Sequence, residues 1–203
     1  MSRRKHWIYG MVLVALVGTT GCRVDADDHG DSKNVRISTP FGGVQVKTND
    51  AAVQEGTGLP AYPGATVVRK DKDSGAADID LSFGEFRLRV KAVSYHSDDA
   101  PEKVAAFYRN ALQRFGDVIT CQHGVAVGQP SHTAEGLTCQ QTHDEHVKVT
   151  DDFSGRLELK AGSEKHQHMV ELDADGSGTR FGLVALDLPA HLVVEDGKDQ
   201  HMQ

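Results

Sequence analysis

Histidine is the residue type in this sequence that most directly suggests chemistry, because imidazole is a common ligand of zinc and copper. Of the eleven histidines, His143 and His146 lie in "HDEH", and His166 and His168 lie in "KHQH". Residues two apart in a strand project from one face, so His166 and His168 could both reach one Zn²⁺ or Cu²⁺. The alternative, exposed histidines on the wet face of a sheet, is favoured because spacing fixes no third ligand.

Catalytic motifs of the common hydrolases and nucleotide-binding enzymes are not found in the sequence. It has no Gly-x-Ser-x-Gly elbow, no His-Glu-x-x-His and no glycine-rich loop ending in Lys-Ser or Lys-Thr. A hydrolase of unknown type remains an alternative, since acid and base carboxylates among 29 acidic residues depend on geometry and not on spacing. We therefore expect a non-catalytic protein and name no catalytic residue.

The N-terminus has the three parts of a secretory signal. Arg3, Arg4 and Lys5 precede an apolar run from Trp7 to Val17, which has roughly half of the ~20 apolar residues that a membrane-spanning helix needs. Small residues follow the run, as they do before a signal-peptide cleavage site. A short buried helix is the alternative, and the flanking residues argue against it.

The residues that end this run, "GTTGC" (18–22), resemble the lipobox of bacterial lipoprotein signal peptides. The resemblance implies that the Cys22 thiol receives a diacylglyceryl group, that the chain is cut after Gly21, and that acyl chains such as palmitate hold the mature protein to a membrane. The family usually has Leu three residues before the cysteine, where this chain has Thr19, so ordinary signal-peptide cleavage near the same place is the alternative. The implied location is the bacterial cell envelope, with the domain in the periplasm or outside the cell.

The other two cysteines, Cys121 and Cys139, are then an even pair in an exported protein. An oxidising compartment favours a disulfide between them. In the chain-entropy model, a loop of this length gives a stabilisation of about 3 kcal/mol. A metal or redox site is the alternative, but the sequence has no Cys-x-x-Cys.

The charge balance limits the partners of the protein. Its formal net charge of −7 becomes −10 if the signal is removed, because three basic residues and no acidic residue are lost with it. Nucleic-acid binding requires a basic surface, so we exclude it. An acidic chain also does not adhere to anionic headgroups, so membrane contact should come through the N-terminal lipid. A protein or small-molecule partner is left unnamed.

Composition and periodicity divide the chain into four parts: a signal peptide (1–21), a lipid-anchored flexible tether (22–33), a single domain (34–189) and a polar C-terminal tail (190–203). The tether is expected because "RVDADDHGDSK" is polar and lacks an apolar period. Between tether and tail, the chain is long enough for one domain with one ordinary core.

Within the domain, alternation predicts strands and one stretch predicts a helix. Two period-two runs flank "PFGG" (40–43) and predict a hairpin. Alternation over 79–92 places Ile79, Leu81, Phe83, Phe86, Leu88, Val90 and Ala92 on one face, with Arg87, Arg89 and Lys91 opposite. Apolar residues recur at helical spacing over 99–115, with Asp99 as the expected cap. Further strands are expected in "DVITC", "HVKVTD", "GRLELKAG", "HMVELDAD" and "TRFGLVALDLP".

These elements predict an α+β fold, a mainly antiparallel β-sheet with one principal amphipathic helix (about 99–115) packed on its apolar face. The pairing of "YPGA" (62–65) with "DAPEKVAAFYRNAL" (99–112) resembles a module of uncharacterised bacterial exported proteins and lipoproteins, and it implies no activity. We expect a membrane-anchored envelope lipoprotein that is a non-catalytic binding or structural module. The alternatives are a periplasmic protein that binds zinc or copper through the histidines, and a hydrolase.

Overall fold

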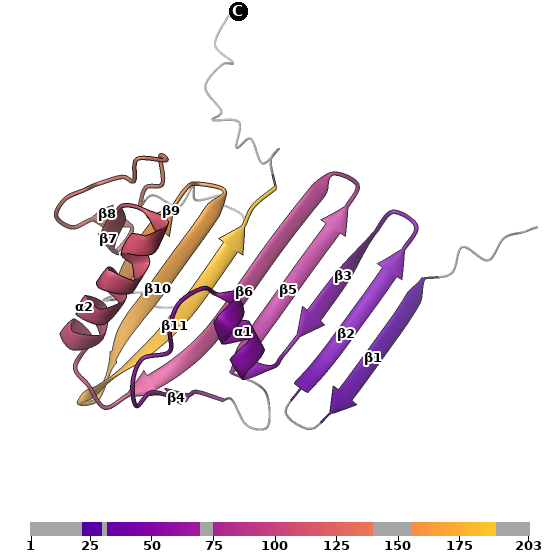
Figure 1. Ribbon diagram of the computed structural model, residues 1–203, viewed down its shortest axis with the longest axis horizontal. Helices are drawn as coiled ribbons and strands as arrows, with labels where there is room; N and C mark the ends of the chain where they lie inside the picture. The colour runs from indigo at the N-terminus through magenta and orange to yellow at the C-terminus, as the bar shows by residue number, and fades with distance from the viewer. Residues whose placement is uncertain (1–21, 30–31, 70–74, 140–155, 190–203) are drawn as a thin grey trace, which may run out of the picture.

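The computed structural model describes residues 22–29, 32–69, 75–139 and 156–189 (Figure 1). The helices are α1 (Asp50–Gly56) and α2 (Pro101–Leu112), the latter followed by the 3₁₀ turn η1 (Gln113–Phe115). The strands are β1 (Arg23–His29), β2 (Ser32–Thr39), β3 (Gly42–Lys47), β4 (Thr66–Val67), β5 (Ala76–Phe83), β6 (Phe86–Ser97), β7 (Val118–Gln122), β8 (Val125–Ala126), β9 (Leu157–Gly162), β10 (His166–Asp175) and β11 (Gly178–Asp187).

All described strands belong to one antiparallel sheet. Its order is β1-β2-β3-β5-β6-β11-β10-β9-β7-β8, and the short β4 pairs with β6. The prediction of a mainly antiparallel sheet is confirmed, and the structure has two helices beside it. The predicted strand in "HVKVTD", the signal peptide and the C-terminal tail lie outside the described residues.

The N-terminal edge of the sheet differs from the expected tether. The hairpin around residues 40–43 is confirmed, since β2 and β3 pair from Asn34↔Lys47 to Thr39↔Gly42. Residues 23–29, however, form β1, which pairs with β2 at seven positions. The side chain pattern did not indicate a strand because β1 is held by main-chain pairing and not by a core, as the 63% exposure of Val24 shows.

Helix α1 occupies a stretch for which we predicted neither a helix nor a strand. Its N-cap is Asn49, whose side-chain oxygen accepts a hydrogen bond from the Ala52 N–H at 2.9 Å. One side chain of the helix, Val53, is buried in the core. Because Val53 is the only large apolar residue of this helix, periodicity could not indicate it.

Helix α2 lies across β9, β10 and β11, on the same side of the sheet as α1 (Figure 1). Its buried residues include Val104, Tyr108 and Leu112, as the helical spacing predicted. Tyr108 is fully buried, and its ring lies 5.4 Å from that of Phe181 on β11. The helix therefore encloses the main core between itself and the C-terminal half of the sheet.

Asp99 does not cap α2. The N-cap is Ala100, which makes no side-chain cap hydrogen bond. The Asp99 carboxylate instead accepts hydrogen bonds from Lys103 Nζ at 2.8 Å and from the Tyr62 hydroxyl at 2.7 Å. These two donors lower the pKa of Asp99, first through Lys103 and then through Tyr62. Asp99 thus ties the loop at Tyr62 to the start of the helix.

The face of the sheet that the helices cover is the opposite of the one we predicted. On β6, Val93 and Tyr95 are buried beneath the helices. Earlier on the same strand, the side chains that project from this face are those of Arg87, Arg89 and Lys91. The apolar residues from Phe86 to Ala92 project from the other face. The prediction was wrong because β6 carries apolar residues on one face in its first half and on the other face in its second half.

The predicted disulfide is present and lies in a second, smaller core. Cys121 on β7 is bonded to Cys139, with Cα atoms 5.5 Å apart. Both cysteines are buried together with Ile119 and Leu137. The disulfide therefore holds the segment that ends at residue 139 against the β7 end of the sheet.

Replacing Cys121 and Cys139 together by alanine should lower the free energy of unfolding by about 3 kcal/mol, because the unfolded chain regains the entropy of an 18-residue loop. Urea unfolding followed by circular dichroism measures the difference, in a background where Cys22 is serine. Adding reductant should shift the parent protein and leave the double variant unchanged. An equal unfolding midpoint for parent and variant would contradict this structural role.

Candidate functional site

One apolar surface is the face of the sheet turned away from both helices, which we call the open apolar face. The strand registers place on it apolar side chains from β1, β2, β3, β5, β6, β10 and β11. Its members are Val24, Ala26, Val35, Ile37, Val44, Val46, Ile79, Leu81, Phe83, Phe86, Leu88, Val90, Ala92, Met169, Val184 and Leu186. None of them belongs to either buried cluster of the described residues.

The most exposed large side chains of this face lie on β1, β2, β5 and β6. Val24 is 63% exposed, Phe83 48%, and Phe86 and Val35 38% each. Contiguous apolar surface of this kind on a protein marks an interaction site more often than it arises by chance. The site is therefore a surface that could bind an apolar partner.

Cys22 lies at a corner of this surface. It is exposed and directly precedes β1, whose first residue, Arg23, pairs with Ser38 near the end of β2. A chemical group on the Cys22 thiol would therefore extend from the rim of the sheet without entering the core. Among the helices that the structure describes, none has the length and apolar character to cross a membrane.

The structure gives His166 and His168 different partners. The imidazole Nδ1 of His166 lies 2.9 Å from Asp187 Oδ1, and both side chains are more than half exposed. His168 Nδ1 lies 3.0 Å from the Thr57 carbonyl oxygen, to which it donates. His143 and His146 lie outside the described residues, so the proposed zinc or copper site stays a prediction. No group of three or more potential ligands occurs within the described ranges.

His168 acts as a packing residue. Its ring stacks on Phe115 with centroids 3.5 Å apart and an interplanar angle of 8°. Burial lowers the pKa of His168, although the hydrogen bond to Thr57 acts in the other direction. The contact joins β10 to the end of α1 and to η1. Sequence analysis missed this role because Thr57 lies 111 residues away in the chain.

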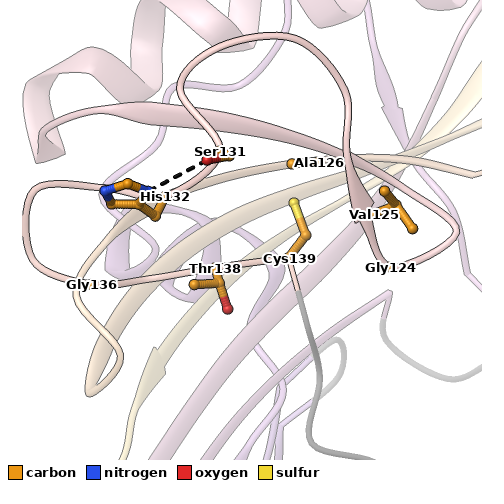
Figure 2. A pocket seen from close by; sticks show the side chains of 8 residues that line it. All are labelled: Gly124, Val125, Ala126, Ser131, His132, Gly136, Thr138 and Cys139. Carbon is orange, nitrogen blue, oxygen red and sulfur yellow. Dashed lines mark hydrogen bonds between the residues drawn. The ribbon is translucent and has the colours of Figure 1, made fainter.

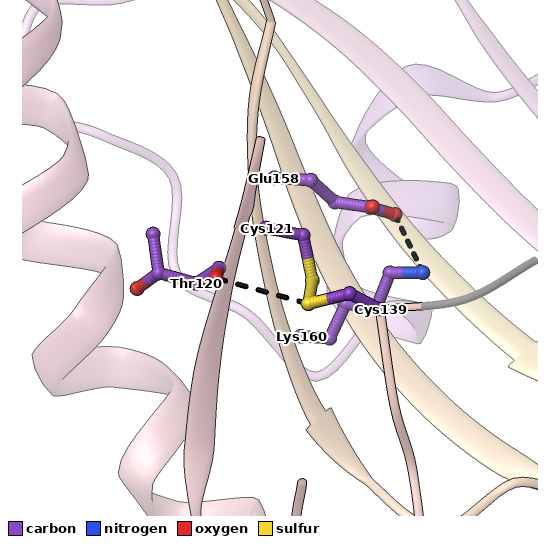
Figure 3. Close-up of a disulfide and its surroundings, with 5 residues drawn as sticks. All are labelled: Thr120, Cys121, Cys139, Glu158 and Lys160. Carbon is purple, nitrogen blue, oxygen red and sulfur yellow. Dashed lines mark hydrogen bonds and ion pairs between the residues drawn. A yellow bond between two sulfur atoms is a disulfide. The ribbon is translucent and has the colours of Figure 1, made fainter. Parts of the chain in front are cut away.

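A buried ion pair beside the disulfide was also not predicted (Figure 3). Lys160 Nζ lies 3.2 Å from Glu158 Oε1, with side chains only 4% and 16% exposed. Burial raises the pKa of the Glu158 carboxyl, and Lys160 partly offsets this effect. The stretch "GRLELKAG" was predicted only as a strand, and the ion pair lies where the second core with Cys121 and Cys139 meets β9. A buried pair of this kind costs desolvation energy and is weak evidence for stability.

One cavity holds a neighbouring hydroxyl and imidazole (Figure 2). Ser131 Oγ lies 3.4 Å from His132 Nδ1, in a cavity of about 510 Å³ that also adjoins Cys139 and the β8 residues Val125 and Ala126. A serine nucleophile normally needs a histidine that a carboxylate orients. The lining residues include no Asp or Glu among those described, and the hydrolase alternative stays a prediction.

Stability should fall as the pH drops from about 7.5 to 5.5, because unfolded His168 takes up a proton near pH 6.5. In the folded state the pKa of His168 is lowered, so the folded protein takes up this proton only at a lower pH. The groups facing this ring are Asp187, which favours protonation, and Arg114 and His166, which oppose it. We expect His168→Asn to reduce the dependence of the urea midpoint on pH.

The matched control is His166→Asn, two residues away on the same strand, where the side chain is 71% exposed. It should retain most of the pH dependence of the parent. Equal slopes for His168→Asn and the parent protein would show that His168 is not the group responsible.

Comparison with known proteins gives this chain no relative. No family model, no curated protein and no solved structure matches it. The resemblances to lipoprotein signals and to an exported module therefore stay predictions. The function is argued below from the chain's own residues.

Proposed function

We propose that this protein is a lipoprotein of the bacterial cell envelope, held to a membrane by acyl chains on Cys22. Its domain lies in the periplasm or outside the cell and has a non-catalytic binding or structural role. The observation that carries the proposal is the position of Cys22, exposed and immediately before the first strand of the sheet.

This position supports lipidation because it keeps the acylated residue outside both cores. The main core is formed by the helices and the C-terminal half of the sheet, and β1 lies at the far edge of the sheet order. Two or three acyl chains give firm anchoring, whereas one gives only marginal binding. A short distance between the anchor and β1 then keeps the sheet close to the membrane.

An exported location also suits the cysteines. Cys121 and Cys139 form a buried disulfide, which leaves Cys22 as the free cysteine of the described chain. Disulfides of this structural kind are typical of oxidising compartments. The division of roles, one cysteine for the lipid and two for the fold, supports the signal peptide and the location together.

A non-catalytic role is supported by how the polar side chains are used. Asp99 and Lys103 hold the start of α2, and His168 packs beneath Phe115. Lys91 and Arg89 pair with Asp78 and Asp80 across β5 and β6. These groups stabilise the fold, while the open apolar face carries apolar side chains from seven strands.

Metabolic labelling with an alkyne fatty acid tests the anchor. The parent chain should carry the label and sediment with membranes, whereas Cys22→Ser should lose both properties. Arg23→Ser is the matched control, since it changes the neighbouring residue and keeps the thiol, and it should label as the parent does. Equal labelling of the parent and Cys22→Ser would refute the proposal.

A further inference from the structure

Three phenylalanines lie exposed at the tips of two neighbouring hairpins. Phe41 is in the turn between β2 and β3 and is 83% exposed, and Phe83 and Phe86 close the turn between β5 and β6 at 48% and 38%. We call these three residues the phenylalanine edge. Phe41 occupies a turn position, where Gly, Pro, Asn, Asp and Ser are the usual residues. Phe83 and Phe86 are the strand residues that flank the next turn.

The registers place the phenylalanine edge at the same end of the sheet as Cys22. Gly42, directly after Phe41, pairs with Phe83, and Phe83 pairs with Phe86. Arg23, directly after Cys22, pairs with Ser38 close to the same turn. In Figure 1 the tips of both hairpins and the start of β1 lie along the upper rim of the sheet. The anchor residue and the three aromatic rings therefore lie along one rim.

The fold itself does not require these rings. None of the three belongs to a buried cluster of the described residues or is packed against one. The other strongly exposed large apolar side chains are Val24, Val35 and Ile37 on β1 and β2, and Val125 and Val127 at the opposite edge of the sheet. Most of this exposed apolar surface thus lies in the part of the sheet that begins at Cys22.

The charges next to the rings are nearly balanced, although the whole chain is acidic. Arg23 is paired with Asp25 at 2.9 Å. Glu85 and Arg87, of opposite charge, are the neighbours of Phe86. A rim without an excess of negative charge can approach lipid headgroups, whereas the acidic remainder of the chain is repelled by anionic ones.

We propose that the phenylalanine edge inserts into the interfacial layer of the phospholipid bilayer and fixes the orientation of the domain on the membrane. This inference rests on the anchoring of Cys22 proposed above. Aromatic and apolar side chains buried at the boundary between headgroups and acyl chains are the usual means by which proteins lie on a membrane. The acyl chains are the first attachment and the phenylalanine edge is the second. With both in place, the open apolar face is held beside the bilayer and the helices point away from the rim.

The test attaches residues 22–203, which contain the whole described fold, to the membrane chemically. The Cys22 thiol is coupled to a maleimide lipid in phosphatidylcholine vesicles, so the result does not depend on native lipidation. The only tryptophan of the sequence, Trp7, is absent from this chain, and Phe41→Trp therefore introduces a single probe. Its emission should shift to the blue on coupling and lose intensity when the vesicles contain lipids brominated on the acyl chains.

The matched control is Val125→Trp, at a 66% exposed position on β8 at the other edge of the sheet. Its emission should be unchanged by coupling and by brominated lipid. Unchanged emission of Trp at position 41, or equal quenching at both positions, would overturn the inference while leaving the labelling result at Cys22 intact.

A second measurement uses the uncoupled chain with Cys22→Ser. Its partition into phosphatidylcholine vesicles, measured by flotation, should fall about tenfold for each phenylalanine of the edge replaced by serine. Val125→Ser with Val127→Ser should leave partition unchanged, and unfolding curves confirm that each variant is folded. If the phenylalanine variants instead abolish a dimer seen by light scattering without vesicles, and partition is unaffected, the edge binds a second copy and the inference is wrong.

Discussion

The structure depends on the packing of one aromatic cluster beneath α2. Tyr108 is fully buried against Phe181, and Phe181 stacks on Tyr95 with ring centroids 5.5 Å apart. Tyr62 joins the cluster at 6.1 Å from Phe181 and donates its hydroxyl to Asp99. These contacts unite a loop, the helix and two strands that are distant in sequence. Removing one buried ring of this size typically lowers the free energy of unfolding by about 3–5 kcal/mol. The docking of α2 and the pairing of β6 with β11 therefore depend on the same contacts.

The cluster also determines which face of β6 is buried. Because successive side chains of a strand alternate between faces, burying Val93 and Tyr95 forces Val90 and Ala92 to the other side. The helices therefore form a second layer over β5, β6, β9, β10 and β11 on one side of the sheet. The open apolar face lies on the other side and follows directly from where the helices dock.

Local sequence patterns predicted helix α2 and strands such as β5 and β6, but they did not predict which face of the sheet is buried. The period of 3.6 residues in α2 and the alternation in β5 and β6 depend on neighbours in sequence, and the structure confirms both elements. The disulfide, which joins residues 18 apart, was predicted from the even number of cysteines left after Cys22 and is also confirmed. The choice between the two faces of β6 depends on Phe181, almost ninety residues later, and no local pattern contains it. The same reason applies to His168 and Thr57, and to Asp99, whose partners include Tyr62. Strand β1 escaped prediction because its pairing uses main-chain groups, which every residue other than proline supplies equally.

If the protein is anchored through Cys22 as proposed, the pairing of β1 with β2 has a mechanical consequence. All load on the anchor enters the domain through β1, which is paired at seven positions with β2 and with no other described strand. A force along the strand axis loads all of these residue pairs at once. A force across the sheet separates them one at a time, starting at Arg23. The direction of the force therefore decides whether the outer strand resists or peels away. Peeling would lengthen the connection between membrane and domain while the aromatic core stays folded.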